Sequence, residues 1–138
     1  MAFAQNEAAR KEFNTENKLA IQGYDPVAYF VQNKAVEGKA SFSYTYQNIV
    51  YRFSSAANLD LFKSNPDKYE PQYGGWCAYA MGAKGEKVEI NPKTFKIING
   101  KLFLFYNAFF NNTLESWNED EQRLHKAADL NWNKIVGK

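Results

Sequence analysis

The sequence is poor in the residues that build metal and redox centres, because its 138 residues include one cysteine, Cys77, and one histidine, His125. One cysteine excludes an intramolecular disulfide and any metal site that needs two thiolates from one chain. Long apolar runs are also missing, so we expect no membrane-spanning helix. The net charge is only +2, and no basic run is longer than Arg10-Lys11, which argues against nucleic-acid binding.

Aromatic residues are abundant and make up 17% of the chain, with 11 Phe, 9 Tyr and 3 Trp. We therefore expect a core built largely from rings. Tyrosine hydroxyls need a hydrogen-bond partner when they are buried, and such groups also line ligand pockets. The length is typical of one domain that buries its own hydrophobic core without disulfides.

The first residues resemble the end of a secretory signal. Ala2-Phe3-Ala4 followed by Gln5 matches the A-x-A pattern that precedes signal cleavage. This pattern predicts an exported protein, periplasmic or secreted. Residues 6–14 are predicted to form a short polar helix, and residues 1–17 as a whole an N-terminal tether. The folded domain is predicted over residues 18–138.

Residues 42–53 show the alternation of a β-hairpin. Apolar side chains occupy every second position, and Gln47-Asn48 supplies a two-residue turn. With this turn every apolar side chain faces one side of the hairpin, as in a half-buried sheet. The predicted cross-strand pairs are Tyr46 with Ile49, Tyr44 with Tyr51 and Phe42 with Phe53.

Short helices are predicted between the strands. Asp25-Pro26 is a typical helix start, because Asp accepts free amide hydrogens and Pro suits the first turn. Ser54-Ser55 predicts the cap of a second helix. That helix ends at Asn65-Pro66, since the residue before a proline is pushed out of the helical conformation. Gly82 to Gly85 are predicted to form a flexible link.

A second hairpin is predicted over residues 95–105, where Asn99-Gly100 is the pair that a type I′ turn favours. Residues 112–135 predict a long helix, because apolar side chains recur there at helical spacing. These side chains are Leu114, Trp117, Leu124, Ala128, Trp132 and Ile135. We therefore predict an α+β fold, in which a small antiparallel sheet built from the two β-hairpins packs against short helices and a long C-terminal helix.

Several short motifs follow one another along the chain. The first are Tyr24-Asp-Pro-Val27, Tyr51-x-Phe53-x-Ser55, and then Phe62, Pro66 and Tyr69. The later ones are Pro71-Gln-Tyr-Gly-Gly-Trp-Cys-Ala78, Asn91-Pro92, Ile97-Ile-Asn-Gly-Lys-Leu-Phe103 and Ala128-Asp-Leu-Asn-Trp132. In order and spacing the motifs resemble the YHS domain family, and the later ones resemble its longer, exported branch. The resemblance runs from about residue 19 to the C-terminus.

The resemblance also shows which functional residues are replaced. In metal-linked YHS members, Asp-Pro-Val-Cys and Tyr-x-Phe-Cys-Ser-x-x-Cys elements supply thiolates, which suit Cu(I) or Zn(II). In this chain the three cysteine positions are Ala28, Ser54 and Asn58, and the position of the name-giving histidine is Tyr46. Alanine cannot bind a metal, and serine and asparagine are weak ligands for soft metals. The thiolate site that the family name would imply is therefore absent.

Cys77 and the aromatic residues around it are the first candidates for a ligand site. Cys77 follows two glycines, where the backbone can approach another group closely. It is interpreted either as a lone thiolate or as a small buried apolar residue. Asp25 is likewise either a ligand contact or a helix cap. The predicted ligand-binding residues are Tyr24, Asp25, Tyr51, Tyr73, Trp76 and Cys77.

His125 follows Glu121 by four residues on the predicted C-terminal helix, so their side chains can meet on one face. The pair is either half of a metal site, an acid–base pair or a surface ion pair. Cys77 and His125 are the candidate metal ligands, with copper or zinc as the candidate ions.

These observations predict a non-enzymatic, exported binding or accessory domain of the YHS family. Its expected partner is a metal ion, in metal or redox homeostasis, or a small organic molecule. One alternative is a small enzyme or redox protein that uses Cys77 or the Glu121–His125 pair. A second alternative is an interaction module whose aromatic surface binds another protein. Neither nucleic acid nor a membrane span is expected.

Overall fold

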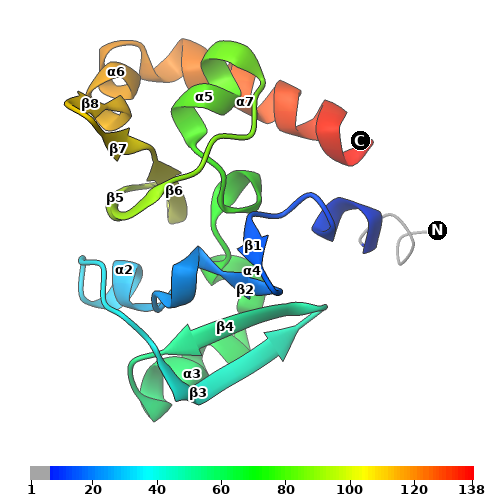
Figure 1. Cartoon of the computed structure of the whole chain (residues 1–138), viewed down its shortest axis with the longest axis vertical. Coiled ribbons are helices and arrows are strands. Elements are labelled where there is room, and N and C mark those ends of the chain that lie inside the picture. The colour runs from blue at the N-terminus through cyan, green and yellow to red at the C-terminus, as the bar shows by residue number, and fades with distance from the viewer. Residues whose placement is uncertain (1–6) are drawn as a thin grey trace.

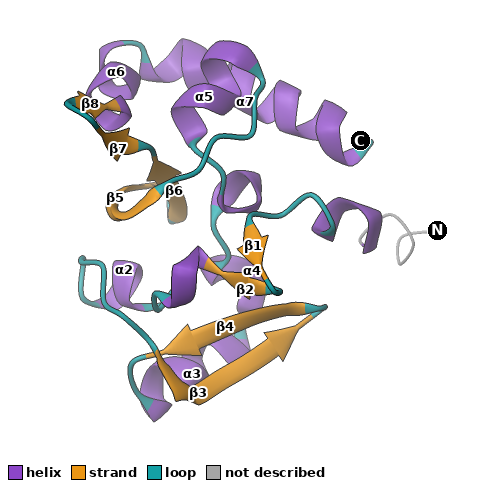
Figure 2. Ribbon diagram, viewed as in Figure 1, coloured by secondary structure: helices purple, strands orange, loops and turns teal. Residues whose placement is uncertain are grey.

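A computed structural model of the chain describes residues 7–138 and has the predicted α+β fold, with small sheets and a long C-terminal helix (Figures 1 and 2). The predicted cleavage site at Ala2 to Gln5 lies outside the described residues. Within residues 7–138, no helix combines the length and the hydrophobicity that a membrane crossing requires.

The N-terminal half contains a four-stranded sheet with its helices. Residues 7–10 are helical. The elements that follow are β1 (Thr15–Glu16), β2 (Leu19–Ala20), η1 (Ile21–Gly23), α2 (Ala28–Val31), β3 (Lys39–Tyr46), β4 (Ile49–Phe53), α3 (Ala56–Ser64), α4 (Pro66–Tyr69) and η2 (Gln72–Gly75). The strand order is β1-β2-β4-β3, and β2 pairs with β4 in parallel. The predicted domain start at residue 18 thus falls between the paired strands β1 and β2.

The C-terminal half contains the second hairpin and three helices. Its elements are α5 (Ala78–Lys84), β5 (Asn91–Ile98), β6 (Lys101–Phe105), β7 (Asn107–Ala108), β8 (Asn111–Asn112), α6 (Thr113–Glu119) and α7 (Glu121–Val136). Figure 2 shows α5, α6 and α7 gathered at one end of the molecule, while β3 and β4 lie at the other. The two predicted hairpins therefore belong to separate sheets, because β2 rather than β5 or β6 pairs with the second edge of β4.

The β3–β4 hairpin confirms most of the predicted register. Tyr46 pairs with Ile49 and Tyr44 with Tyr51, but the predicted Phe42–Phe53 pair is wrong. Phe53 pairs with Lys39, because the register shifts between Lys39 and Ser43. The hydroxyl of Ser43 donates to the carbonyl of Ala40 at 2.7 Å and closes this irregular segment locally.

Strand β6 lies between two hydrophobic cores. Its residues 102–105 are fully buried, although neighbouring side chains of a strand point to opposite faces. Leu102 and Leu104 pack into one core, which includes Tyr51 and Phe62 from the N-terminal half. Phe103 and Phe105 pack into a second core with the three C-terminal helices. The chain thus joins its two halves through one strand that is covered on both faces.

The six apolar residues predicted as the stripe of the C-terminal helix all pack into the second core. They lie on two helices rather than one, because Asp120 adopts a non-helical conformation with φ −150° and ψ 45°. The periodicity does not reveal this break, since the apolar residues on both sides of it still face the same core.

The predicted flexible link at Gly82 to Gly85 is wrong. Residues 78–84 form helix α5, and Gly85 ends it in a left-handed conformation with φ 67°. Gly82 lies inside the helix, where a Cβ would collide with the carbonyl oxygen of Leu124 on α7. A glycine at this position thus serves the close approach of two helices, not chain flexibility.

We predict that Phe103→Ala lowers the free energy of unfolding by about 3–5 kcal/mol, because it leaves a cavity in a fully buried site. Phe110→Ala is the matched control, since Phe110 is 112% exposed and its removal should change stability by no more than about 0.5 kcal/mol. Urea unfolding followed by circular dichroism measures both variants. Similar losses in the two would contradict the role assigned to β6.

Candidate functional site

Asp25 is a fully buried carboxylate that accepts hydrogen bonds through both oxygens. Its Oδ1 accepts from the backbone amides of Val27 at 2.8 Å and Ala28 at 3.2 Å, at the start of α2. Its Oδ2 accepts from the Ser54 amide at 2.8 Å, the Ser54 hydroxyl at 2.7 Å and the Asn58 side-chain amide at 2.8 Å. These five bonds tie α2 to the beginning of α3.

The three positions at which the motif resemblance predicts the cysteines of metal-linked YHS proteins therefore meet around one carboxylate. Ala28 contributes its backbone amide, while Ser54 and Asn58 contribute side chains whose Oγ and Nδ2 atoms are 3.5 Å apart. Every group here donates to Asp25, and none is a thiolate, so the set does not fit a soft metal ion. Across residues 7–138 no three His, Cys, Asp or Glu side chains are grouped to hold a metal.

Cys77 is fully buried at the N-terminus of α5. Its sulfur accepts a hydrogen bond from the Tyr106 amide at 3.3 Å and lies 3.5 Å from the Thr113 hydroxyl. The residue borders a shallow cavity of about 250 Å³ that Tyr106 and Thr113 also line. These contacts match the interpretation of Cys77 as a small buried residue that joins α5 to the β7–β8 region.

Glu121 and His125 have separate partners. The Glu121 carboxylate accepts from the Lys96 ammonium at 2.6 Å and from the Trp117 indole at 2.9 Å. The hydrogen bond from Lys96 is the main reason why the pKa of Glu121 lies below its ordinary value. His125 Nε2 lies 3.6 Å from Asp129 Oδ2, one turn further along α7. Glu121 thus forms an ion pair with Lys96, while His125 lies beside Asp129.

The predicted aromatic ligand site is not assembled, because its members are divided between the two hydrophobic cores. Tyr51 belongs to the first hydrophobic core and Tyr73 to the second. Their polar atoms are hydrogen-bonded within the protein: Tyr51 to Glu70, Tyr73 to Asp129 at 2.7 Å, and the Trp76 indole to the Glu12 carbonyl at 2.6 Å. Tyr24 forms a backbone bridge with Glu37.

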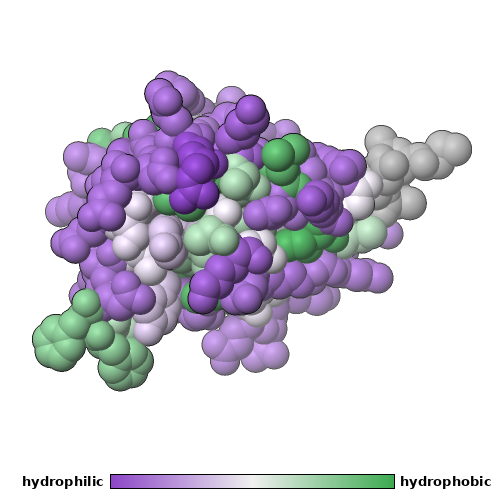
Figure 3. Space-filling view, turned by 90° about the horizontal axis from the view of Figure 1, so that it is seen from above, coloured by the Kyte–Doolittle hydropathy of each residue, from purple (hydrophilic) through white to green (hydrophobic). Residues whose placement is uncertain are grey.

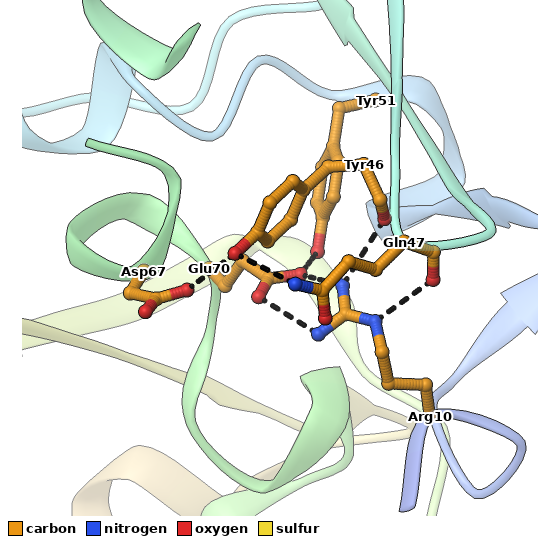
Figure 4. Close-up of polar contacts among 6 residues, drawn as sticks. All are labelled: Arg10, Tyr46, Gln47, Tyr51, Asp67 and Glu70. Atoms are coloured by element: carbon orange, nitrogen blue, oxygen red, sulfur yellow. Dashed lines mark hydrogen bonds and ion pairs between the residues drawn. The ribbon is translucent and has the colours of Figure 1, made fainter. Parts of the chain in front are cut away.

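Arg10 and Glu70 form a largely buried ion pair that sequence reasoning missed (Figure 4). The guanidinium donates to both Glu70 oxygens, at 3.2 Å and 2.5 Å, and to the carbonyls of Gln47 and Tyr46. The Tyr51 hydroxyl donates to the same carboxylate. Burial, and then the charge of Glu70, raise the pKa of Tyr51 well above its ordinary value. This network fastens the N-terminal segment to the turn of the β3–β4 hairpin.

A cavity of about 590 Å³ lies where β1, β2 and η1 meet the outward face of β4. Its lining combines charged, amide and apolar side chains: Asn14, Thr15, Glu16, Asn17, Leu19, Ile21, Gln22, Val50, Arg52 and Glu89. The Nε atom of Arg52 is buried and has no hydrogen-bond partner among the described residues. A buried donor without a partner is rare in folded proteins and calls for an explanation.

The wall of this cavity contains unusual backbone conformations. Ile21 and Gln22 have positive φ angles of 54° and 52°, and Ile21 is β-branched, which makes its conformation a genuine outlier. The Gln22 side chain donates to the Ile90 carbonyl at 3.1 Å and helps to hold the turn. Strained residues of this kind occur preferentially at binding sites. The alternation along β4 indicates that Arg52 faces away from the core, but it does not indicate a cavity there.

No family model, curated protein or solved structure matches this chain. Its function is therefore inferred from the site geometry and from the motif resemblance alone.

We predict that Asp25→Ala lowers the free energy of unfolding by about 3–5 kcal/mol, because it leaves buried donors of Val27, Ser54 and Asn58 unpaired. Asp60→Ala on the exposed side of α3 is the control, with an expected change within about 0.5 kcal/mol. Denaturant unfolding measures both. A loss below about 1 kcal/mol in Asp25→Ala would show that the network is not structural.

Proposed function

We propose that the chain is a non-enzymatic, exported binding domain on a YHS-type scaffold, and that its ligand is a small organic molecule. The proposal rests on the cavity beside β4. Arg52 lines this cavity, and its buried Nε has no hydrogen-bond partner within residues 7–138. The volume of about 590 Å³ falls within the usual range for ligand pockets, roughly 300–1,000 Å³.

The Asp25 network supports the scaffold part of the proposal. If the resemblance to YHS proteins is correct, the family's cysteine positions should lie close together. Ser54 and Asn58 both bond to Asp25, and Ala28 does so through its backbone. The positions thus converge, while hydrogen bonds take the place that metal–thiolate bonds would have.

A binding role also agrees with the partners of the groups considered for catalysis. Cys77 is buried and bonded to the Tyr106 amide, whereas a reactive thiol needs access and a base beside it. Glu121 is engaged by Lys96 and Trp117. These side chains stabilise contacts between elements, and the cavity beside β4 is built from other residues.

We expect some members of a panel of small polar metabolites to raise the melting temperature, while Cu(I) and Zn(II) leave it unchanged. A ligand at about 100 times its Kd adds roughly 2.7 kcal/mol to the stability of the folded state. Differential scanning fluorimetry provides the measurement. Cys77→Ser should keep the full response, because Cys77 borders a different cavity.

The triple variant Ala28→Cys/Ser54→Cys/Asn58→Cys is the positive control for the metal arm, with circular dichroism as the check of its fold. We expect it to bind Co(II) with the absorption bands of thiolate coordination, since the three positions converge. Metal stabilisation of the unmodified chain, with no response to any organic compound, would overturn the proposed ligand class.

A protein-interaction module is a second candidate, favoured by the tip of the β7–β8 hairpin. Phe109 and Phe110 form this tip and are 90% and 112% exposed. Figure 3 shows apolar side chains projecting at one corner of a mostly hydrophilic surface. Both residues have positive φ angles, 52° and 62°, which Asn-Gly adopts at lower cost. Exposed rings on a strained turn add no contacts to the core, so they favour a role in binding another molecule.

Replacing the pair by Phe109→Asn/Phe110→Gly should raise the free energy of unfolding by about 1–2 kcal/mol, because it relieves backbone strain without removing core contacts. The reverse change at the other hairpin, Asn99→Phe/Gly100→Phe, should lower stability, since those residues have similar φ angles of 52° and 74°. Urea unfolding measures both. Destabilisation by the first double substitution would show that the two rings are kept for folding.

A further inference from the structure

The cavity beside β4 contains charges of both signs. Among the described residues that line it, Arg52 is the single cationic side chain, while Glu16 and Glu89 are the acidic ones. Asn14, Thr15, Asn17 and Gln22 add neutral hydrogen-bonding groups to the lining. A ligand that fits must therefore satisfy a guanidinium and at least one carboxylate within the same space.

Arg52 provides the site for a carboxylate. The guanidinium of an arginine carries a positive charge and five N–H donors in a planar fork. This fork pairs with a carboxylate through two parallel hydrogen bonds. Arg52 forms no salt bridge with any described residue, in contrast to Arg10 and Arg123, which pair with Glu70 and Asp120. Within residues 7–138, no group accepts a hydrogen bond from the Arg52 guanidinium, and its Nε is buried. The terminal amino groups of the fork therefore remain for a ligand anion.

Glu89 provides a site for a cation. Its Oε1 atom accepts from the Asn14 side chain at 2.6 Å and from the Ile90 amide at 2.9 Å. Both bonds go to the same oxygen and hold the carboxylate in one orientation. Among residues 7–138, Oε2 has no hydrogen-bond partner in the protein, so it can accept from an ammonium group.

The apolar part of the lining consists of Leu19, Ile21 and Val50. A plain anion would pair with Arg52 but would also face two glutamates, and a plain cation would face Arg52. A zwitterion matches both signs, and an aliphatic or amide side chain matches the remaining surface. Charge complementarity therefore selects the ligand class more sharply than the volume does.

We infer that this cavity binds a small zwitterion, an amino acid or a short peptide, with its carboxylate on Arg52 and its ammonium on Glu89. The inference rests on the proposed function, because it assigns the ligand class to the proposed binding cavity. Arg52 sets the position of the acid end, and Glu89 sets the position of the amine end.

Isothermal titration calorimetry with the twenty standard L-amino acids and with dialanine tests the inference on the full chain. We expect at least one compound to bind with a Kd below about 1 mM. Its deaminated acid and its decarboxylated amine should each bind at least tenfold more weakly, because each loses one of two charged hydrogen-bonded contacts. For L-leucine these analogues are 4-methylpentanoate and 3-methylbutylamine.

Two variants assign the ends of the ligand. Arg52→Gln should weaken binding of the amino acid roughly tenfold to a hundredfold and leave the amine analogue unaffected. Glu89→Gln should weaken the amino acid and leave the acid analogue unaffected. Arg123→Gln is the matched control, because Arg123 is an exposed residue on α7 and is paired with Asp120. Arg52→Lys keeps the charge without the fork and should have an intermediate effect.

The outcomes separate this inference from the proposed function. If the acid analogue binds as tightly as the amino acid, the ligand is a plain anion and the zwitterion is excluded. If no amino acid or peptide binds while another metabolite raises the melting temperature, the ligand class is wrong and the binding function stands. Binding that is equally weakened by Arg52→Gln and Arg123→Gln would overturn the assignment of the carboxylate to Arg52.

Discussion

The fold depends on the burial of β6 on both faces. Leu102 and Leu104 complete the core beneath β4 and α3, and Phe103 and Phe105 complete the core beneath α5 to α7. Because one strand serves both cores, the two halves of the chain cannot separate without exposing apolar surface in each. The cavity beside β4 thereby has a wall whose inner face belongs to a packed core, and firm support of this kind suits the ligand site proposed here.

Two carboxylates complement this apolar framework, Asp25 fully buried and Glu70 largely buried. Asp25 joins α2 to α3, and Glu70 joins the N-terminal segment to β4 through Arg10 and Tyr51. Asp25 accepts five hydrogen bonds and Glu70 accepts three, so both fix the relative positions of segments. Arg52 differs from both, because its buried Nε has no hydrogen-bond partner in the described part of the chain. An unsatisfied donor thus distinguishes the residues around the cavity from the two carboxylate networks.

Local sequence patterns predicted the elements that depend on neighbouring residues. The Asn99-Gly100 turn, the Ser55 cap of α3 and the apolar stripe of the C-terminal region are all present. Three predictions were wrong: the Phe42–Phe53 pair, the Gly82–Gly85 link and the unbroken C-terminal helix. They depend, in turn, on a β-bulge, on the contact between α5 and α7 and on the interruption of a helix at Asp120. Sequence periodicity encodes none of these features.

The sequence by itself determined the α+β class and the lack of a second thiolate, because composition and short-range spacing decide both. Only the tertiary structure placed Ala28, Ser54 and Asn58 around Asp25 and separated Tyr51 from Tyr73. It also formed the cavity that brings Arg52 together with Glu89. Such placements join residues that are far apart in the chain, so they follow from how the two cores pack against β6.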